Sequence, residues 1–375
     1  MGVELLTPPT AHARTEDPDI RRKVALVSFD RRSFAALGGS AASAYALVWL
    51  WFHVLAPMTG AVGFWLCTYG VFVLIYWLVT RELEGPVVAG DRFMGTIIAT
   101  GGLMLIVPLV LIAGYVVMRG AAAITLHFFT QTLATVGPED PATAGGGAHA
   151  IVGTLEQVGL AVLITVPLGF LCAIFLNEVG GPLRHPVRTF VDAMSGVPTI
   201  VAGMFIYAIW VVGLHKGFSG WAATLAISIS MLPIITRTSE EILRLVPNGL
   251  RESSLALGAT EWHTVRGVVL PTARSGLITA VILGVARAVG ETAPLIMTTF
   301  GAYEMNANPF RGPQEALPLF VYTNLRSSIP AQVERGWAGA LVLILLVLTL
   351  FTLARFLGTR AARGGRLRRA PERFR

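Results

Sequence analysis

The sequence predicts an all-α protein that crosses a membrane about eight times. Of its 375 residues, 54% are hydrophobic and only 14% are charged, whereas soluble domains average about 25% charged residues. The apolar residues also form long uninterrupted blocks, and a block of about 18 or more is typical of a transmembrane helix. Helices are the predicted spanning elements because each satisfies its own backbone hydrogen bonds in lipid, and the long runs lack the alternation of an outer-membrane barrel.

Eight blocks are long enough to span: Ala41–Met58, Ala61–Thr80, Met94–Met118, Ile151–Leu176, Val191–Gly213, Trp221–Ile235, Gly276–Phe300 and Trp337–Leu357. The turn at residues 56–60 makes the first two a predicted hairpin. The expected organisation is a mostly disordered cytoplasmic arm at 1–38, an extra transmembrane hairpin at 39–92, a first core helix with an extracytoplasmic loop at 93–150, a transmembrane domain at 151–358 and a basic cytoplasmic tail at 359–375.

The distribution of basic residues predicts the orientation of these spans. If the N-terminus is cytoplasmic, 23 of the 29 Lys and Arg residues fall on the cytoplasmic side, five fall outside, and Arg287 lies within a span. Cytoplasmic loops of membrane proteins carry such an excess. Both termini of this multi-pass protein are therefore expected in the cytoplasm.

The sequence contains no motif of a soluble catalytic or nucleotide-binding domain. It has no GxxxxGK[ST], HExxH or CxxC pattern, and Cys67 and Cys172 both lie in apolar blocks. The net charge of +7 follows the positive-inside pattern and does not call for a nucleic-acid partner. We expect a membrane protein with no cofactor, no metal and no ATPase site of its own, in contact with membrane lipid.

The segment Arg237–Pro271 is longer and more patterned than a simple connection between spans needs. Thr238–Glu241 is typical of a helix N-terminus, and Pro247 to Gly249 predicts a break. A short helix is then expected over Leu250–Leu257, ended by Gly258 at positive φ, with Thr260 capping a second helix that leads to Pro271. Such an elbow either docks into a groove on another protein or packs under its own bundle; the exposed leucines favour docking.

This loop resembles the EAA loop of binding-protein-dependent ABC permeases. That pattern reads E-A-A, three residues, Gly, nine residues, I-x-L-P, and this chain has Glu252-Ser253-Ser254, Gly258 and Val268-Val269-Leu270-Pro271 at the same spacing. The resemblance covers roughly Gly153–Arg355 and implies a six-helix type I permease core in the inner membrane of a bacterium. It also implies that an ATPase grips the loop through Glu252, Ser253, Ser254, Leu255, Leu257, Gly258, Ala259, Thr260, Leu270 and Pro271.

Arg287 and Glu291 are charged residues within an apolar block, where charge is costly and is kept mostly for function. Their spacing of four places them on one helical face. Two interpretations remain open on physical grounds. The two charges neutralise each other and fix helix packing, or Arg287 presents its fork of donors to a passing oxyanion while Glu291 holds the guanidinium or selects a protonated anion.

The sequence around these residues is similar to that of the phosphate-specific permeases of the PstA type. The similar stretches are ARAVGETAPL from Ala286, SGVPTIVAG from Ser195 and RESSLALGAT from Arg251. The resemblance implies a phosphate path at Arg287 and Glu291, with Thr292, Thr199 and Thr298 as candidate neutral donors. Pro198 is expected to break its span, which either exposes a positive helix end to an anion or forms a packing kink.

The same resemblance implies the partners. They are a second homologous permease subunit (PstC type), a cytoplasmic ATPase dimer that uses ATP (PstB type) and an extracytoplasmic phosphate-binding protein (PstS type). The alternatives are a permease of this type for molybdate, sulfate or phosphonate, and an ion-coupled secondary transporter that uses Arg287 and Glu291 as a charge relay. The extra hairpin departs from the six-span family core, and the sequence assigns it no function.

Overall fold

The computed structural model describes residues 31–56 and 59–367, and in these ranges the chain is helical apart from loops and one isolated bridge between Phe300 and Gln314. Within the described residues, seven helices are long and apolar enough to cross a membrane, and one bent helix pair makes an eighth candidate. This confirms the predicted all-α membrane fold. Most of the predicted arm (residues 1–30) and the last eight residues of the predicted tail (368–375) lie outside the described residues.

The chain forms two compact units, and the first extends to Val110. It contains α1 (Arg31–Leu50), η2 (Trp51–Leu55), α2 (Ala61–Glu84) and the beginning of α3 (Pro86–Ala123). Arg92 ties the three helices together, because it pairs with Glu84 at 2.7 Å and donates to Ser33 Oγ at 2.9 Å. Helices α1 and α2 pack together as a hairpin. Helix α1 begins at Arg31, within the residues expected for the arm, and residue 92 lies inside α3.

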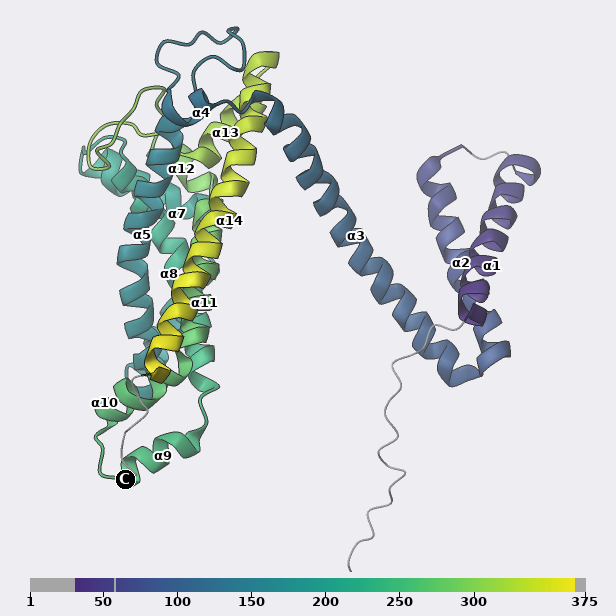
Figure 1. Cartoon of the computed structure of the whole chain (residues 1–375), viewed down its shortest axis with the longest axis horizontal. Helices are drawn as coiled ribbons and strands as arrows, with labels where there is room; N and C mark the ends of the chain where they lie inside the picture. Colours follow the sequence, from purple (N-terminus) through teal and green to yellow (C-terminus); the bar gives the residue numbers. More distant parts are fainter. Residues whose placement is uncertain (1–30, 57–58, 368–375) are drawn as a thin grey trace, which may run out of the picture. The chain divides into compact units, whose positions relative to one another are not determined.

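The second unit, from Leu111 onward, is a helical bundle (Figure 1). After the end of α3 its elements are α4 (Leu126–Thr130), α5 (Ala148–Ile174), η3 (Phe175–Val179), α6 (Arg184–Ser195), α7 (Thr199–Ile206), η4 (Tyr207–Gly213), α8 (Gly220–Arg244), α9 (Asn248–Ala256), α10 (Glu261–Thr264), η5 (Val265–Val269), α11 (Leu270–Val289), α12 (Ala293–Thr298), α13 (Leu317–Leu325) and α14 (Pro330–Leu367). The elements α9 and α10 lie at one end of this bundle, and α4 and the start of α13 lie at the other.

Helix α8 is the centre of the bundle. Its side chains Ile227, Met231 and Ile235 are almost completely buried and form one core with residues of α5 and α11. Glycines let the neighbouring helices approach closely. A Cβ at Gly169 of α5 or at Gly284 of α11 would lie within 3 Å of the Ile235 side chain. Small residues at helix crossings are typical of membrane bundles, where association depends on close packing.

Three predicted spans differ from the structure. The span expected over 191–213 is α6 and α7–η4, which meet at an angle of 101° around Pro198. The span expected to end near Ile235 continues as α8 to Arg244, so Thr238–Glu241 is interior helix and not a helix N-terminus. The span expected over 276–300 begins earlier, at Glu261, and ends at Val289; residues 290–292 separate it from α12, which has Pro294 in its first turn. The basic tail expected from 359 begins as the end of α14.

Candidate functional site

The elbow that precedes α11 has the predicted geometry. Helix α9 ends near Ala256, and Gly258 follows at a φ of +84°. Thr260 caps α10, because its side-chain oxygen accepts a hydrogen bond from the backbone N–H of His263 at 3.3 Å. A left-handed residue at this place is the usual way to end a helix, and glycine adopts it without strain.

The elbow presents apolar side chains to the outside of the bundle. Leu257 is 89% exposed, Trp262 is 62% exposed and Leu255 is 45% exposed. Glu252, Ser253 and Thr260 are also exposed. Ser254 instead points back, and its hydroxyl lies 2.9 Å from that of the buried Thr264 in α10. Exposed leucines and a tryptophan on a short helical elbow are the type of apolar anchor used in helix-in-groove recognition.

The elbow continues directly into the bundle. Residues Glu261–Val289 form one helical run of 29 residues, made of α10, η5 and α11. We call this run the long rod. The π-helical segment η5 precedes Pro271, which has no N–H to donate to a regular helix. Of the predicted coupling residues, Leu270 and Pro271 therefore lie inside the long rod and not at a joint between two helices.

Arg287 lies in the last turn of the long rod, and Glu291 lies just beyond its end. Arg287 Nε and Glu291 Oε1 are 3.3 Å apart. The two side chains differ in environment, since that of Arg287 is 57% exposed and that of Glu291 only 13%. The predicted pair therefore exists, although Glu291 is not on the α11 helix, because the helix ends at Val289.

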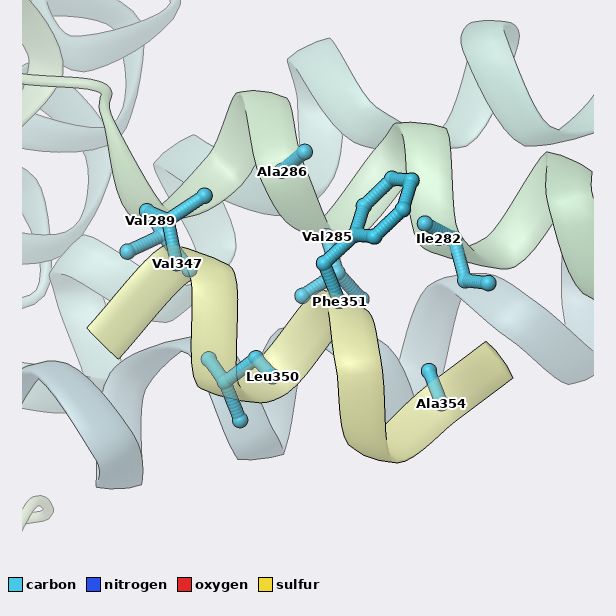
Figure 2. Close-up of a pocket in the computed structure, with 8 residues that line it drawn as sticks. All are labelled: Ile282, Val285, Ala286, Val289, Val347, Leu350, Phe351 and Ala354. Carbon is cyan, nitrogen blue, oxygen red and sulfur yellow. The ribbon is translucent and has the colours of Figure 1, made fainter. Parts of the chain in front are cut away.

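Arg287 belongs to an exposed polar strip along the long rod. The strip consists of exposed residues three or four positions apart, which are Thr272, Ser275, Thr279, Leu283 and Arg287. Figure 2 shows a different face of α11, where Ile282, Val285, Ala286 and Val289 meet α14. The residues of α14 at this contact are also apolar: Val347, Leu350, Phe351 and Ala354. The arginine thus lies away from the α14 contact and on an open face of the chain.

The candidate threonines have different environments. Thr298 is completely buried, and its hydroxyl donates to the Pro294 carbonyl of its own helix at 2.8 Å, so it is not an open donor. Thr292 and Thr199 are partly exposed, at the starts of α12 and α7. These two helices pack together closely: a Cβ at Gly203 of α7 would lie 2.6 Å from the Pro294 Cα.

Sequence reasoning missed a set of ion pairs at the elbow end of the bundle. Arg251 of α9 pairs with Glu178 of η3 at 2.8 Å, and Arg237 pairs with Asp192 at 2.7 Å. Glu240 accepts hydrogen bonds from Arg188 and from Arg244. Most of these partners come from helices 45 to 73 residues apart in sequence. The only sequence signal was the gathering of charges near predicted span ends.

A second missed cluster is buried at the opposite end of the bundle. Gln157 of α5 donates to Gln314 Oε1 at 3.0 Å, and Gln314 donates to Glu156 Oε2 at 2.5 Å. The neighbouring Glu315 carboxylate accepts from the backbone N–H groups of Ala302 and Ala316. Burial raises the pKa of Glu315 to about 7, because a charged carboxylate loses its hydration there. This cluster holds the loop before α13 onto the bundle.

A helical bundle with an external helix–glycine–helix elbow that runs on into a core helix is the arrangement of a type I ABC permease. The chain belongs to the family described as binding-protein-dependent transport system inner membrane component, whose profile matches residues 165–363. It is therefore a membrane-embedded subunit of an ABC transporter.

Curated relatives are more specific. The chain is 40% identical to phosphate transport system permease protein PstA 1 of Mycobacterium tuberculosis over 273 residues, which cover 72% of this chain and 88% of the relative. It is 42% identical to the PstA protein of Mycobacterium leprae over 272 residues, covering 71% and 89%.

A solved bacterial alginate ABC transporter, in complex with an alginate pentasaccharide-bound periplasmic protein, has the same fold. The TM-score is 0.53 at 14% identity, and the match covers 76% of this chain and 98% of that chain. At this identity the likeness concerns the fold alone.

Proposed function

We propose that this chain is the membrane-spanning permease subunit of an ATP-driven importer of inorganic phosphate. The observation that supports the proposal is the long rod, which has the exposed elbow at one end and Arg287 at the other. The names of the curated relatives support phosphate as the substrate. ATP hydrolysis belongs to a cytoplasmic ATPase dimer, and a second permease subunit and an extracytoplasmic phosphate-binding protein complete the complex.

The exposed polar strip supports a path along this face. Arg287 and the other residues of the strip are unfavourable against lipid chiefly because of the arginine, since Thr272 and Thr279 already donate to carbonyls of their own helix. They are favourable against a second permease subunit with a hydrated path between the two. The guanidinium of Arg287 offers several donors in a planar fork, which suits the oxygens of a tetrahedral anion. Glu291 lies close enough to compete with phosphate for that guanidinium and so keep binding at Arg287 weak enough for release.

The proposed mechanism has three steps. The binding protein delivers phosphate at the end that carries α4 and α13. Closure of the ATPase dimer displaces α9 and the beginning of the long rod. The resulting motion of the long rod and of the helices packed against it changes the side from which Arg287 is accessible. This mechanism places both termini and the elbow in the cytoplasm, as the positive-inside pattern favours.

Uptake by the whole complex tests the proposal. Complexes in vesicles with internal ATP and external binding protein should accumulate labelled phosphate, and excess sulfate, molybdate or phosphonate should not compete. Arg287→Ala should abolish uptake while the complex still assembles. Arg119→Ala is the matched control, since Arg119 is an arginine at the end of α3 that contacts Tyr115, away from the polar strip. Competition by another oxyanion would reassign the substrate, and uptake without the ATPase would indicate a secondary transporter.

A further inference from the structure

Arg251 is the best-connected side chain of α9. It forms a two-pronged contact with Glu178, in which Nη2 donates to Oε1 at 2.8 Å and Nε donates to Oε2 at 3.2 Å. The two side chains are only 17% and 9% exposed. Parallel donation by a guanidinium to a carboxylate fixes direction as well as distance, so this contact specifies how α9 sits on the bundle.

The remaining donors of Arg251 reach the end of α8. Nη2 donates to the Leu243 carbonyl at 2.8 Å, and Nη1 donates to the Val246 carbonyl at 2.5 Å and to Asn248 Oδ1 at 3.2 Å. The last carbonyls of a helix have no partner within the helix, and a cation near them also favours the helix dipole. Arg251 thereby satisfies the end of the central helix while it holds Glu178.

Glu178 connects this contact to a third helix. It lies in η3, which continues directly from α5. Its carboxylate is further fixed by Asn177, whose side-chain amide donates to Oε1 at 2.6 Å. Arg251 therefore joins α9, α8 and α5 at one point, and no other hydrogen bond or ion pair assigned among the described residues joins α9 to α5.

The outward and inward sides of α9 have separate roles. Glu252 and Leu255 are exposed, whereas Arg251 and Ser254 contact the rest of the chain. Ser254 leads to the long rod through Thr264. Arg251 leads to α5 and α8, which form the largest helix contact of the bundle core. A displacement of α9 can therefore be transmitted to the membrane-spanning helices through two contacts, one made by Ser254 and one by Arg251.

We propose that Arg251 and Glu178 form a positioning ion pair that transmits displacement of α9 to α5 and α8, in parallel with the long rod. The proposal rests on the proposed function, since it assumes that an ATPase displaces α9. The pair does not touch the substrate path, and its role is to keep ATP hydrolysis and transport in step.

The test measures phosphate uptake and ATP hydrolysis in the same reconstituted complexes. The variants are Arg251→Lys, which keeps the charge but not the planar fork, and Glu178→Gln, which keeps the shape but not the charge. We expect the ATPase to copurify normally and hydrolysis to continue within about twofold. Phosphate imported per ATP hydrolysed should fall at least about tenfold, which corresponds to about 1.4 kcal/mol of coupling.

Arg237→Lys is the matched control. Arg237 pairs with Asp192 at a similar distance of 2.7 Å, but both side chains are about half exposed, and exposed pairs contribute little. This variant should keep the wild-type ratio of uptake to hydrolysis.

Other results overturn the proposal. An unchanged ratio in both test variants would show that the pair does not transmit motion. A parallel loss of uptake and hydrolysis would indicate a docking defect, and failure of both variants to assemble would indicate a purely structural pair. Absence of ATP-dependent phosphate uptake by the wild-type complex would instead refute the proposed function, so the two failures are distinguishable.

Discussion

Gly258 provides a sharp test of the elbow, because its environment isolates one physical effect. Its φ is +84°, and a Cβ built at this position would meet nothing within 4 Å. Gly258→Ala therefore adds backbone strain without a steric clash. Holding a residue with a side chain in the left-handed region costs about 1–2 kcal/mol. If the variant adopts the left-handed conformation only when the elbow is docked, this strain should lower the affinity for the ATPase by about 5- to 30-fold.

Gly249 is the matched control for this substitution. It lies inside α9, its φ is not in the left-handed region, and a Cβ there would also meet nothing within 4 Å. Alanine stabilises a helix interior by up to about 1 kcal/mol relative to glycine. Gly249→Ala should therefore leave ATPase binding unchanged or slightly stronger. Gly258→Asn should fall between wild type and Gly258→Ala, since asparagine tolerates the left-handed region better than alanine.

The assay is titration of the purified ATPase onto nanodiscs that hold both permease subunits, with binding followed at equilibrium. Copurification with the charged variant Gly258→Asp gives a coarser version of the same test. Equal affinity for wild type and Gly258→Ala would refute the reasoning, because it would show that docking adds no strain at residue 258. A loss of the same size in Gly249→Ala would attribute the effect to α9 as a whole.

Three further predictions concern charged groups. Arg287→Lys keeps the charge but loses the planar fork, so phosphate uptake should fall about tenfold, equivalent to about 1.4 kcal/mol, with assembly intact; uptake at the wild-type rate would argue against direct anion contact. Glu291→Gln should change either the uptake rate or the preference for phosphate over sulfate, and the carboxylate has no role in transport if neither changes. Because the pKa of Glu315 is raised to about 7, its ionisation opposes folding increasingly as pH rises from about 4.5 to 7. Glu315→Gln should therefore raise the Tm of the complex more at pH 8 than at pH 5, and an equal shift at both values would contradict this.

Local signals predicted the elbow well. The conformation of Gly258 and the cap at Thr260 depend on a few neighbouring residues, and both have the expected geometry. The number and type of spans also followed from composition, because the bilayer imposes a minimum length on every apolar helix. These features share one property: the physical cause lies within the stretch of sequence that shows the pattern.

Span ends were harder, because charged residues indicated loops where the bundle supplies partners. Arg237 and Glu240 suggested that the span near Ile235 had ended, yet α8 continues to Arg244. Asp192 and Arg188, both on α6, pair with these two residues. A pairing across 45 or 52 residues is set by tertiary packing and has no local signature. The end of α11 is different, since Gly290 and Pro294 are breakers that a stricter interpretation of the sequence would have used.

The candidate site also has one feature that the sequence predicted and one that depends on tertiary packing. The spacing of Arg287 and Glu291 predicted a pair, and the pair is present at 3.3 Å. Which residue would be open could not be predicted, because exposure depends on where α14 and α8 pack against α11. The structure leaves the arginine exposed and nearly buries the glutamate. That difference favours Arg287 as the group that meets an anion and Glu291 as the group that holds the Arg287 guanidinium.

The close contacts between the long rod and α8 also decide how far Arg287 moves under the proposed mechanism. Gly276 lies against Ile242 and Gly284 lies against Ile235, so the natural pivot is near the midpoint of these two contacts. With a rise of 1.5 Å per residue, the arm from the pivot to Glu261 is about 29 Å and the arm to Arg287 is about 10 Å. A rigid tilt that displaces the elbow by about 3 Å would then move Arg287 by only about 1 Å. Such a displacement is too small to carry an anion, but it is enough to make or break a guanidinium hydrogen bond. Tilting of the long rod is therefore suited to changing the strength with which Arg287 binds phosphate. The larger opening of the path must come from α5 and α8, which Arg251 contacts.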